Sequence, residues 1–96
     1  MIEIRKTIIF DRWLSQLRDR KAVARVQSRI DRLQLGLSGD VKPVGEGISE
    51  MRIDYGPGYR IYFLQLGQEL VILLAGGDKS TQRQDIVKAI ALARRL

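Results

Sequence analysis

The fold is decided by residues 48–63, Ile-Ser-Glu-Met-Arg-Ile-Asp-Tyr-Gly-Pro-Gly-Tyr-Arg-Ile-Tyr-Phe. Apolar and polar residues alternate on both sides of Gly56-Pro57-Gly58, which is the pattern of strands with two different faces. Proline fixes φ at the first corner of a turn and glycine accepts a positive φ at the next, so this tripeptide joins the strands tightly. The stretch therefore predicts a β-hairpin, with its second strand continuing to Leu66.

Two further strands flank this hairpin in the sequence. Val41–Val44 contains Pro43, which cannot donate to a sheet ladder and therefore favours an edge position. Glu69–Ala75 follows a Gly67-Gln68 turn and is apolar on both faces, as expected of a central strand that is covered on both sides. Together these segments predict an antiparallel meander of three or four strands.

Helical segments surround the predicted meander. Residues 2–9 begin with alternation and predict a strand that leads into a first helix, which ends near Asp19-Arg20. Thr81 and Gln84 are spaced as a capping box that begins the last helix. The second helix is predicted from an apolar stripe, which comprises Val23, Val26, Ile30, Leu33 and Leu37.

The predicted order of elements is β-α-α-β-β-β-β-α over residues 1–96. This order predicts an α+β fold: an N-terminal strand and a helical hairpin, then an antiparallel meander sheet and a C-terminal helix. A chain of 96 residues suits a single domain with one core. We expect the helices to pack on one face of the sheet and to leave the other face open.

The composition excludes several classes of site. The chain has no Cys and no His, which excludes a disulfide scaffold, a thiol nucleophile, a zinc finger and an imidazole-based triad. It has 17 Lys and Arg against 11 Asp and Glu, a net charge of +6 that favours a polyanionic partner over a charge kept only for solubility. No apolar run reaches the roughly 20 residues that span a bilayer. We therefore expect a soluble, cytoplasmic protein that does not contact a membrane.

Cations gather on the polar face of the predicted hairpin. Arg52 lies on the first strand, Arg60 and Tyr62 lie on the second, and Lys79 follows the last strand. Arginine offers forked donors to phosphate oxygens, lysine a point charge, and tyrosine a stacking surface or a proton donor. These four residues therefore predict a site for a phosphodiester.

Ordinary cross-strand pairing is the alternative interpretation of the same cations. Glu50 or Asp54 would then neutralise Arg52 or Arg60 on a solvated face. The sequence leaves both interpretations open.

The loop at residues 76–81, Gly-Gly-Asp-Lys-Ser-Thr, is not a P-loop. Asp78 separates Gly77 from Lys79, whereas a Walker A motif needs glycine directly before the lysine. The loop still places Lys79 beside the N-terminus of a helix, where a single phosphate contact is expected.

A second set of cations follows the predicted second helix. Their spacing of three, four, four and three residues puts them on one helical stripe beside the apolar one. We expect this stripe to meet RNA phosphates or an acidic partner, and an ordinary solvated face is the alternative. Its members are Arg18, Lys21, Arg25, Arg29 and Arg32.

The motifs of the second half resemble the RelE/ParE toxin superfamily, and most closely its HigB-like, phage-derived branch of addiction module killer proteins. The resemblance extends over nearly the whole chain. It implies a RelE-like fold and the toxin of a type II toxin–antitoxin pair. We expect no cofactor and no metal. The motifs are Gly-Asp-Val-Lys-Pro-Val at 39–44, Ser-Glu-Met-Arg-Ile-Asp at 49–54, Gly-Pro-Gly-Tyr-Arg-Ile-Tyr-Phe at 56–63 and Gly-Gly-Asp-Lys-Ser-Thr-Gln at 76–82.

The resemblance also implies an activity and a set of partners. Relatives cleave mRNA on the ribosome by attack of the 2′-OH on the adjacent phosphate, so we expect an endoribonuclease that blocks translation. Arg60 matches the sheet arginine of the family motif, Arg52 the basic position of the preceding strand, and Lys79 the basic residue after the last strand. The implied partners are the ribosome, mRNA and a cognate antitoxin of the helix-turn-helix, HigA-like kind.

One departure from the family leaves the chemistry open. Several relatives carry a catalytic His or Tyr near the C-terminus, whereas this chain ends Leu-Ala-Arg-Arg-Leu. The sequence therefore offers no obvious general base, and the roles of Tyr62, Tyr55 and Glu50 stay open. The alternatives to a nuclease are a non-enzymatic, ParE-like inhibitor of DNA gyrase and a plain RNA-binding module.

Overall fold

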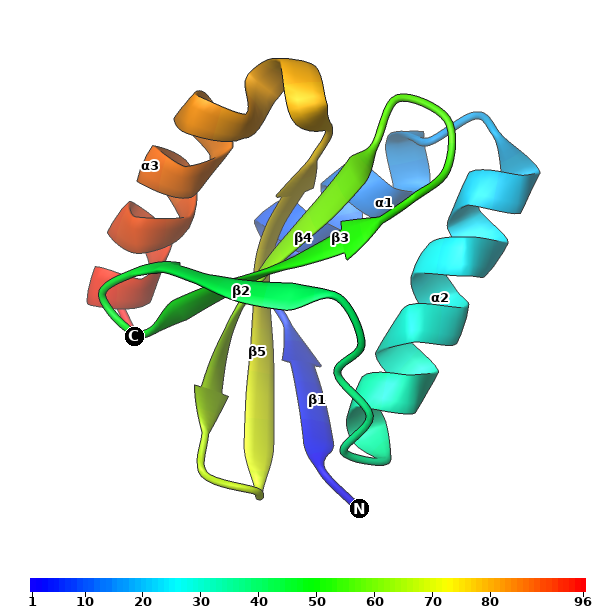
Figure 1. Cartoon of the computed structure of the whole chain (residues 1–96). Helices are drawn as coiled ribbons and strands as arrows, with labels where there is room; N and C mark the ends of the chain where they lie inside the picture. The colour runs from blue at the N-terminus through cyan, green and yellow to red at the C-terminus, as the bar shows by residue number, and fades with distance from the viewer.

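The predicted meander is present in the computed structural model, which describes all residues from 1 to 96. Four strands pair antiparallel in sequence order, and the N-terminal strand adds to the far side of the last one in parallel, so the five-stranded sheet is mixed. The order across the sheet is β1-β5-β4-β3-β2, and the predicted edge position of the Pro43 strand and the α+β class are confirmed (Figure 1). The strands are β1 (Glu3–Lys6), β2 (Val41–Gly45), β3 (Ile48–Ile53), β4 (Tyr59–Leu66) and β5 (Leu70–Gly77).

Two helices separate β1 from the meander, and a third follows it. The helices are α1 (Ile8–Gln16), α2 (Arg20–Gln34) and α3 (Gln82–Arg94), and a short 3₁₀ turn, η1 (Lys79–Thr81), precedes α3. The first helix ends before the predicted Asp19-Arg20, because Asp19 is the N-cap of α2 and accepts hydrogen bonds from the backbone N–H groups of Lys21 (2.9 Å) and Ala22 (3.3 Å). No helix of the chain is long and apolar enough to cross a bilayer.

Helices cover both faces of the sheet, and the expectation of helices on one face only is wrong. In Figure 1, α2 and α3 lie on opposite sides of the sheet. Phe10 of α1 and Val26, Ile30 and Leu33 of α2 share one core cluster with Ile61 of β4. The helix α3 packs on the other face, where the buried cluster comprises Ile48, Tyr62, Leu74, Ala75 and Ala89.

Two consecutive glycines at the end of β5 permit this double covering. A Cβ on Gly76 would overlap the indole of Trp13 from α1, and a Cβ on Gly77 would overlap the carboxylate of Asp85 from α3. Successive residues of a strand face opposite sides of the sheet. The glycine pair therefore lets α1 and α3 approach the same end of β5 from opposite faces.

The apolar stripe of α2 is shifted from the predicted one at both ends. Its buried residues are Ala22, Val26, Ile30 and Leu33. Val23 is only half-buried. Leu37 follows the end of the helix and is 60% exposed. The central part of the stripe is as predicted, since its three-and-four spacing faces the sheet.

The predicted capping box of Thr81 and Gln84 is wrong. Asp78 provides the cap instead, because its Oδ1 accepts a hydrogen bond from the backbone N–H of Ser80 (2.8 Å) and a capping box joins it to Thr81. Thr81 makes no capping hydrogen bond to α3, and its hydroxyl donates to the carboxylate of Asp85 (2.5 Å). The cap therefore begins η1, one short turn before α3.

Candidate functional site

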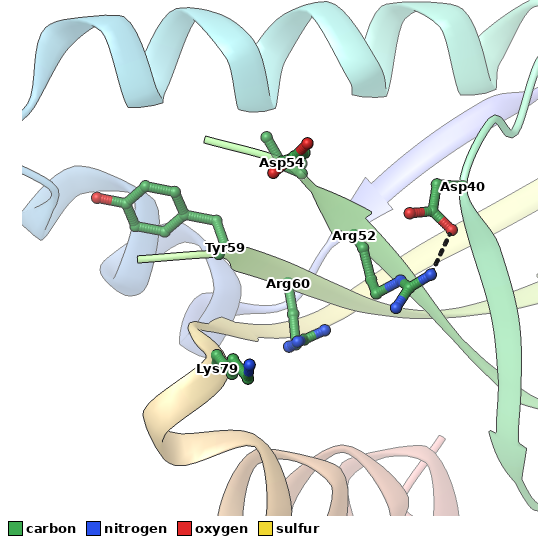
Figure 2. Close-up of a pocket in the computed structure, with 8 residues that line it drawn as sticks. Asp40, Arg52, Asp54, Tyr59, Arg60 and Lys79 are labelled. Atoms are coloured by element: carbon green, nitrogen blue, oxygen red, sulfur yellow. Dashed lines mark hydrogen bonds and ion pairs between the residues drawn. The ribbon is translucent and has the colours of Figure 1, made fainter. Parts of the chain in front are cut away.

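Three of the four residues predicted for the phosphodiester site line one pocket of about 360 Å³. Arg52 of β3 lies opposite Arg60 of β4 in the strand register. Lys79, the first residue of η1, closes the pocket from the end of β5. Figure 2 shows the three cations together with two carboxylates at this end of the sheet. The remaining lining residues are Asp40, Ile53, Asp54, Gly58 and Tyr59.

Arg52 is held by an exposed ion pair. Its Nη2 donates to Oδ1 of Asp40 at 3.1 Å, and this hydrogen bond raises the pKa of Arg52 above its ordinary value. The Arg52 side chain is 46% exposed. Exposed pairs of this kind are weak because water screens both charges. An anion in the pocket can therefore replace Asp40 on Arg52 at little cost.

Arg60 is held by a buried ion pair. Its side chain is only 11% exposed, and Nη1 lies 3.3 Å from Oε1 of the fully buried Glu50. The other Glu50 oxygen accepts a hydrogen bond from Nε2 of Gln82 on α3 (2.8 Å). The cross-strand pairing of Arg60 with Glu50, which was the alternative to a phosphate site, is thus present, and it lies under α3 rather than on a solvated face. It fixes Arg60 at the pocket wall, while Nε of Arg60 has no hydrogen-bond partner.

Tyr62 lies outside the pocket, and the expected stacking surface is absent. Its ring is fully buried under α3, and its hydroxyl has no hydrogen-bond partner. Burial, and next the nearby carboxylate of Glu50, raises the pKa of Tyr62 well above its ordinary value. The physical reason is the position of α3, which covers the face that the alternation of β4 suggested would be open.

Three arginines of α2 line a second pocket that shares two residues with the first. This pocket, of about 270 Å³, shares Ile53 and Asp54 with the first and is otherwise lined by Arg25, Ser28, Arg29 and Arg32. Lys21 is exposed one turn before Arg25 on the same helix face. Arg18 lies in the α1–α2 connection, outside the helix, so it is not part of the helical stripe as predicted.

Two arginines of this stripe have partners within the chain. Arg29 donates from Nη1 to the backbone oxygen of Arg52 (2.8 Å) and from Nη2 to that of Ser38 (3.1 Å), so it ties α2 to β3. The guanidinium of Arg25 lies 4.6 Å from the ring centroid of Tyr55, a cation–π contact. Arg29 thus has a structural role, in line with the alternative of an ordinary helix face at that position.

Tyr55 and the two carboxylates complete the inventory of groups near the site. The Tyr55 hydroxyl donates to Asp19 at 2.8 Å, which raises the pKa of Tyr55 and lowers that of Asp19. Asp40 precedes β2 and no pattern in the sequence pointed to it. Asp54 follows β3, and the alternation of that strand had placed it on the polar face. No group of three or more acidic side chains is placed to hold a metal ion.

Comparisons with known proteins cover the same residues. The profile of a family described as "Phage derived protein Gp49-like (DUF891)" matches residues 12–96, a range that includes every residue of both pockets. An uncharacterized protein of Haemophilus influenzae is 53% identical over 95 residues, which cover 99% of this chain and 96% of that protein. The family match and the pairwise similarity therefore both include β3, β4 and the loop after β5.

Proposed function

This chain belongs to the Gp49-like family of phage-derived proteins, a toxin-like family related to RelE, and we propose that it is the toxin of a type II toxin–antitoxin pair and cleaves translated mRNA on the ribosome. We also propose that it belongs to the HigB-like branch of the RelE/ParE superfamily. The whole chain, residues 1–96, acts as one toxin domain.

The observation that carries this proposal is the meeting of Arg52, Arg60 and Lys79 in one pocket. The three cations come from β3, β4 and the loop after β5, so the fold and not local sequence brings them together. Cations fixed around a phosphate stabilise the negative charge that develops when the 2′-OH attacks it. A pocket of about 360 Å³ accommodates a phosphate with parts of the adjoining nucleotides.

Each cation has a distinct part in the proposed reaction. Arg60 is fixed by Glu50 and presents its guanidinium to the phosphorane without reorganisation. Arg52 exchanges its exposed pair with Asp40 for a second contact to the phosphate. Lys79 is exposed and has no ion pair, and it neutralises charge on the leaving oxygen. Buried Tyr62 is outside this set.

The two pockets would hold successive parts of the RNA strand. Phosphates beyond the cleavage site would pass Asp54 and reach the basic face of α2, where backbone contacts bind RNA without reading its sequence. The residues proposed to make these contacts are Arg18, Lys21, Arg25 and Arg32, with Arg29 supporting them from within the fold.

The proposed partners are the ribosome, mRNA and a cognate antitoxin. The net charge of +6 and the cations of both pockets favour binding of an acidic protein segment over the pockets when the toxin is inactive. We therefore propose an antitoxin of the helix-turn-helix kind whose acidic segment covers these pockets. We propose that the toxin acts on translating ribosomes in the cytoplasm.

Cleavage by the Lys79→Ala variant tests the proposal. Purified ribosomes carrying a defined mRNA are incubated with the wild type, with Lys79→Ala and with Lys88→Ala, a control at an exposed lysine of α3. We expect the wild type and the control to cut the mRNA, and Lys79→Ala to cut it at least about tenfold more slowly, while all three melt at the same temperature. Equal cleavage by all three proteins would show that Lys79 and its pocket take no part in the reaction.

A gyrase inhibitor is the second candidate function. It is favoured by the lack of His and by the carboxylates of Asp40 and Glu50, which already neutralise two of the three cations. Intact mRNA with DNA breaks after induction would support it. Binding of RNA without cleavage of either nucleic acid would instead support a plain RNA-binding module.

A further inference from the structure

The proposed nuclease needs a group that takes the proton from the attacking 2′-OH. The structure leaves few side chains that can accept this proton. The chain has no His. Tyr62 is fully buried, and Glu50 is buried against Arg60. The Tyr55 hydroxyl is engaged by Asp19 and does not line the pocket. Tyr59 also lines the pocket, but Figure 2 shows its hydroxyl directed away from the three cations. The titratable oxygen groups that remain are the carboxylates of Asp40 and Asp54.

These two carboxylates differ in their availability. Asp40 is paired with Arg52 at 3.1 Å, so its lone pairs are directed to a guanidinium. Asp54 is exposed and takes part in none of the ion pairs of the chain. It also lines both pockets, so it lies beside RNA that occupies either of them. Its lack of an ion pair and its position both favour Asp54 over Asp40 as the group that accepts the proton.

The arrangement of the pocket fits a displacement with base and leaving group on opposite sides. Figure 2 shows Asp54 on one side of Arg52 and Arg60, and Lys79 on the other side. In an in-line reaction the attacking and leaving oxygens also lie on opposite sides of the phosphorus. A phosphate held by the two arginines would therefore have a carboxylate facing the attacking oxygen and an ammonium facing the leaving one.

We propose that Asp54 is the general base of this site and accepts the proton of the 2′-OH of the nucleotide that precedes the scissile phosphate. The 2′ oxygen then forms a bond to phosphorus, and the bond from phosphorus to the 5′ oxygen of the next nucleotide breaks. That 5′ oxygen takes a proton from the Lys79 ammonium. The products are a 2′,3′-cyclic phosphate and a 5′-hydroxyl end, and Asp54 and Lys79 exchange their protons with water.

This inference rests on the proposed nuclease activity, and the Asp54→Asn variant tests it separately. Asparagine keeps the size of the side chain but does not accept the proton. On ribosomes carrying a defined mRNA we expect kcat to fall by about 10²–10⁴-fold, with KM within about threefold of the wild type and an unchanged melting temperature. Glu69→Gln, the same loss of charge in the exposed β4–β5 turn, should cleave like the wild type.

The pH dependence separates a base from a structural carboxylate. Without Asp54, hydroxide must take the proton, so residual cleavage by Asp54→Asn should rise about tenfold per pH unit, and Asp54→Glu should recover part of kcat. Cleavage by Asp54→Asn at the wild-type rate, or a change in KM alone, would overturn the assignment of Asp54 and leave the nuclease proposal standing. A wild-type protein that cuts no RNA would overturn both.

Discussion

Replacing Arg60 by alanine should destabilise the protein as well as inactivate it. An Arg60 on an open sheet face, as the alternation of β4 alone predicts, could be removed without loss of stability. In the structure the Arg60 side chain is 11% exposed and pairs at 3.3 Å with Glu50, which is fully buried. Removing one partner leaves the other charge buried and uncompensated, which costs about 3–5 kcal/mol.

Two neighbours of Glu50 limit this cost to the lower end of the range. Gln82 still donates to the carboxylate at 2.8 Å, and Nζ of Lys42 lies 4.0 Å away. A loss of about 3 kcal/mol lowers the melting temperature of a domain of this size by roughly 12–24 °C. The melting temperature of Arg60→Ala, measured by circular dichroism, should therefore lie below that of the wild type by this amount.

A second substitution separates the electrostatic cause from simple loss of packing. Glu50→Gln removes the buried charge and keeps an acceptor for Gln82, so Arg60→Ala with Glu50→Gln should melt higher than Arg60→Ala alone. The double variant should nevertheless cleave no mRNA, because the guanidinium is missing. Melting of Arg60→Ala within about 2 °C of the wild type would refute the reasoning about the buried pair.

Three further predictions follow from contacts outside this pair. Asp40→Asn frees Arg52, so binding of RNA should become about two- to fivefold tighter in a filter-binding assay, and unchanged or weaker binding would contradict this. Asp19→Ala removes the N-cap of α2 and should lower the melting temperature at pH 7. Because the pKa of Asp19 is lowered in the folded chain, the difference in melting temperature from the wild type should shrink as the pH falls below about 4. A difference that stays constant with pH would argue against a charged cap. Gly76→Ala should destabilise the fold by about 1–3 kcal/mol in urea denaturation, because the new Cβ overlaps the Trp13 indole. Adding Trp13→Ala should relieve this overlap, so the double variant should lose less stability than the sum of the two single variants. A loss equal to that sum would show that the indole is not the obstacle.

Local sequence pattern predicts the sheet well because each strand is bounded by its own turn. The Gly56–Gly58 turn, the edge position of Pro43 and the two apolar faces of β5 each follow from backbone and solvation preferences of a few residues. The position of α3 depends instead on contacts between distant residues. The room that Gly77 leaves for Asp85 is one such contact, and no periodicity reports it.

The same distinction explains which site residues could be predicted. Strand alternation and a turn fix the side of the sheet on which Arg52, Arg60 and Lys79 lie, so their meeting in one pocket could be predicted. Tyr62 was misplaced because alternation gives the face of a side chain but not what covers that face. Asp40 was missed because only the β2–β3 pairing brings it to Arg52.

Mapping the ends of mRNA after brief induction of the protein tests the central claim most directly. A nuclease that works through Arg52, Arg60 and Lys79 should leave cuts within translated codons, with 5′-hydroxyl and 2′,3′-cyclic phosphate ends. The same cuts should be much less frequent after induction of Lys79→Ala. Intact mRNA together with DNA breaks in cells that stop growing would contradict the account and support a gyrase inhibitor.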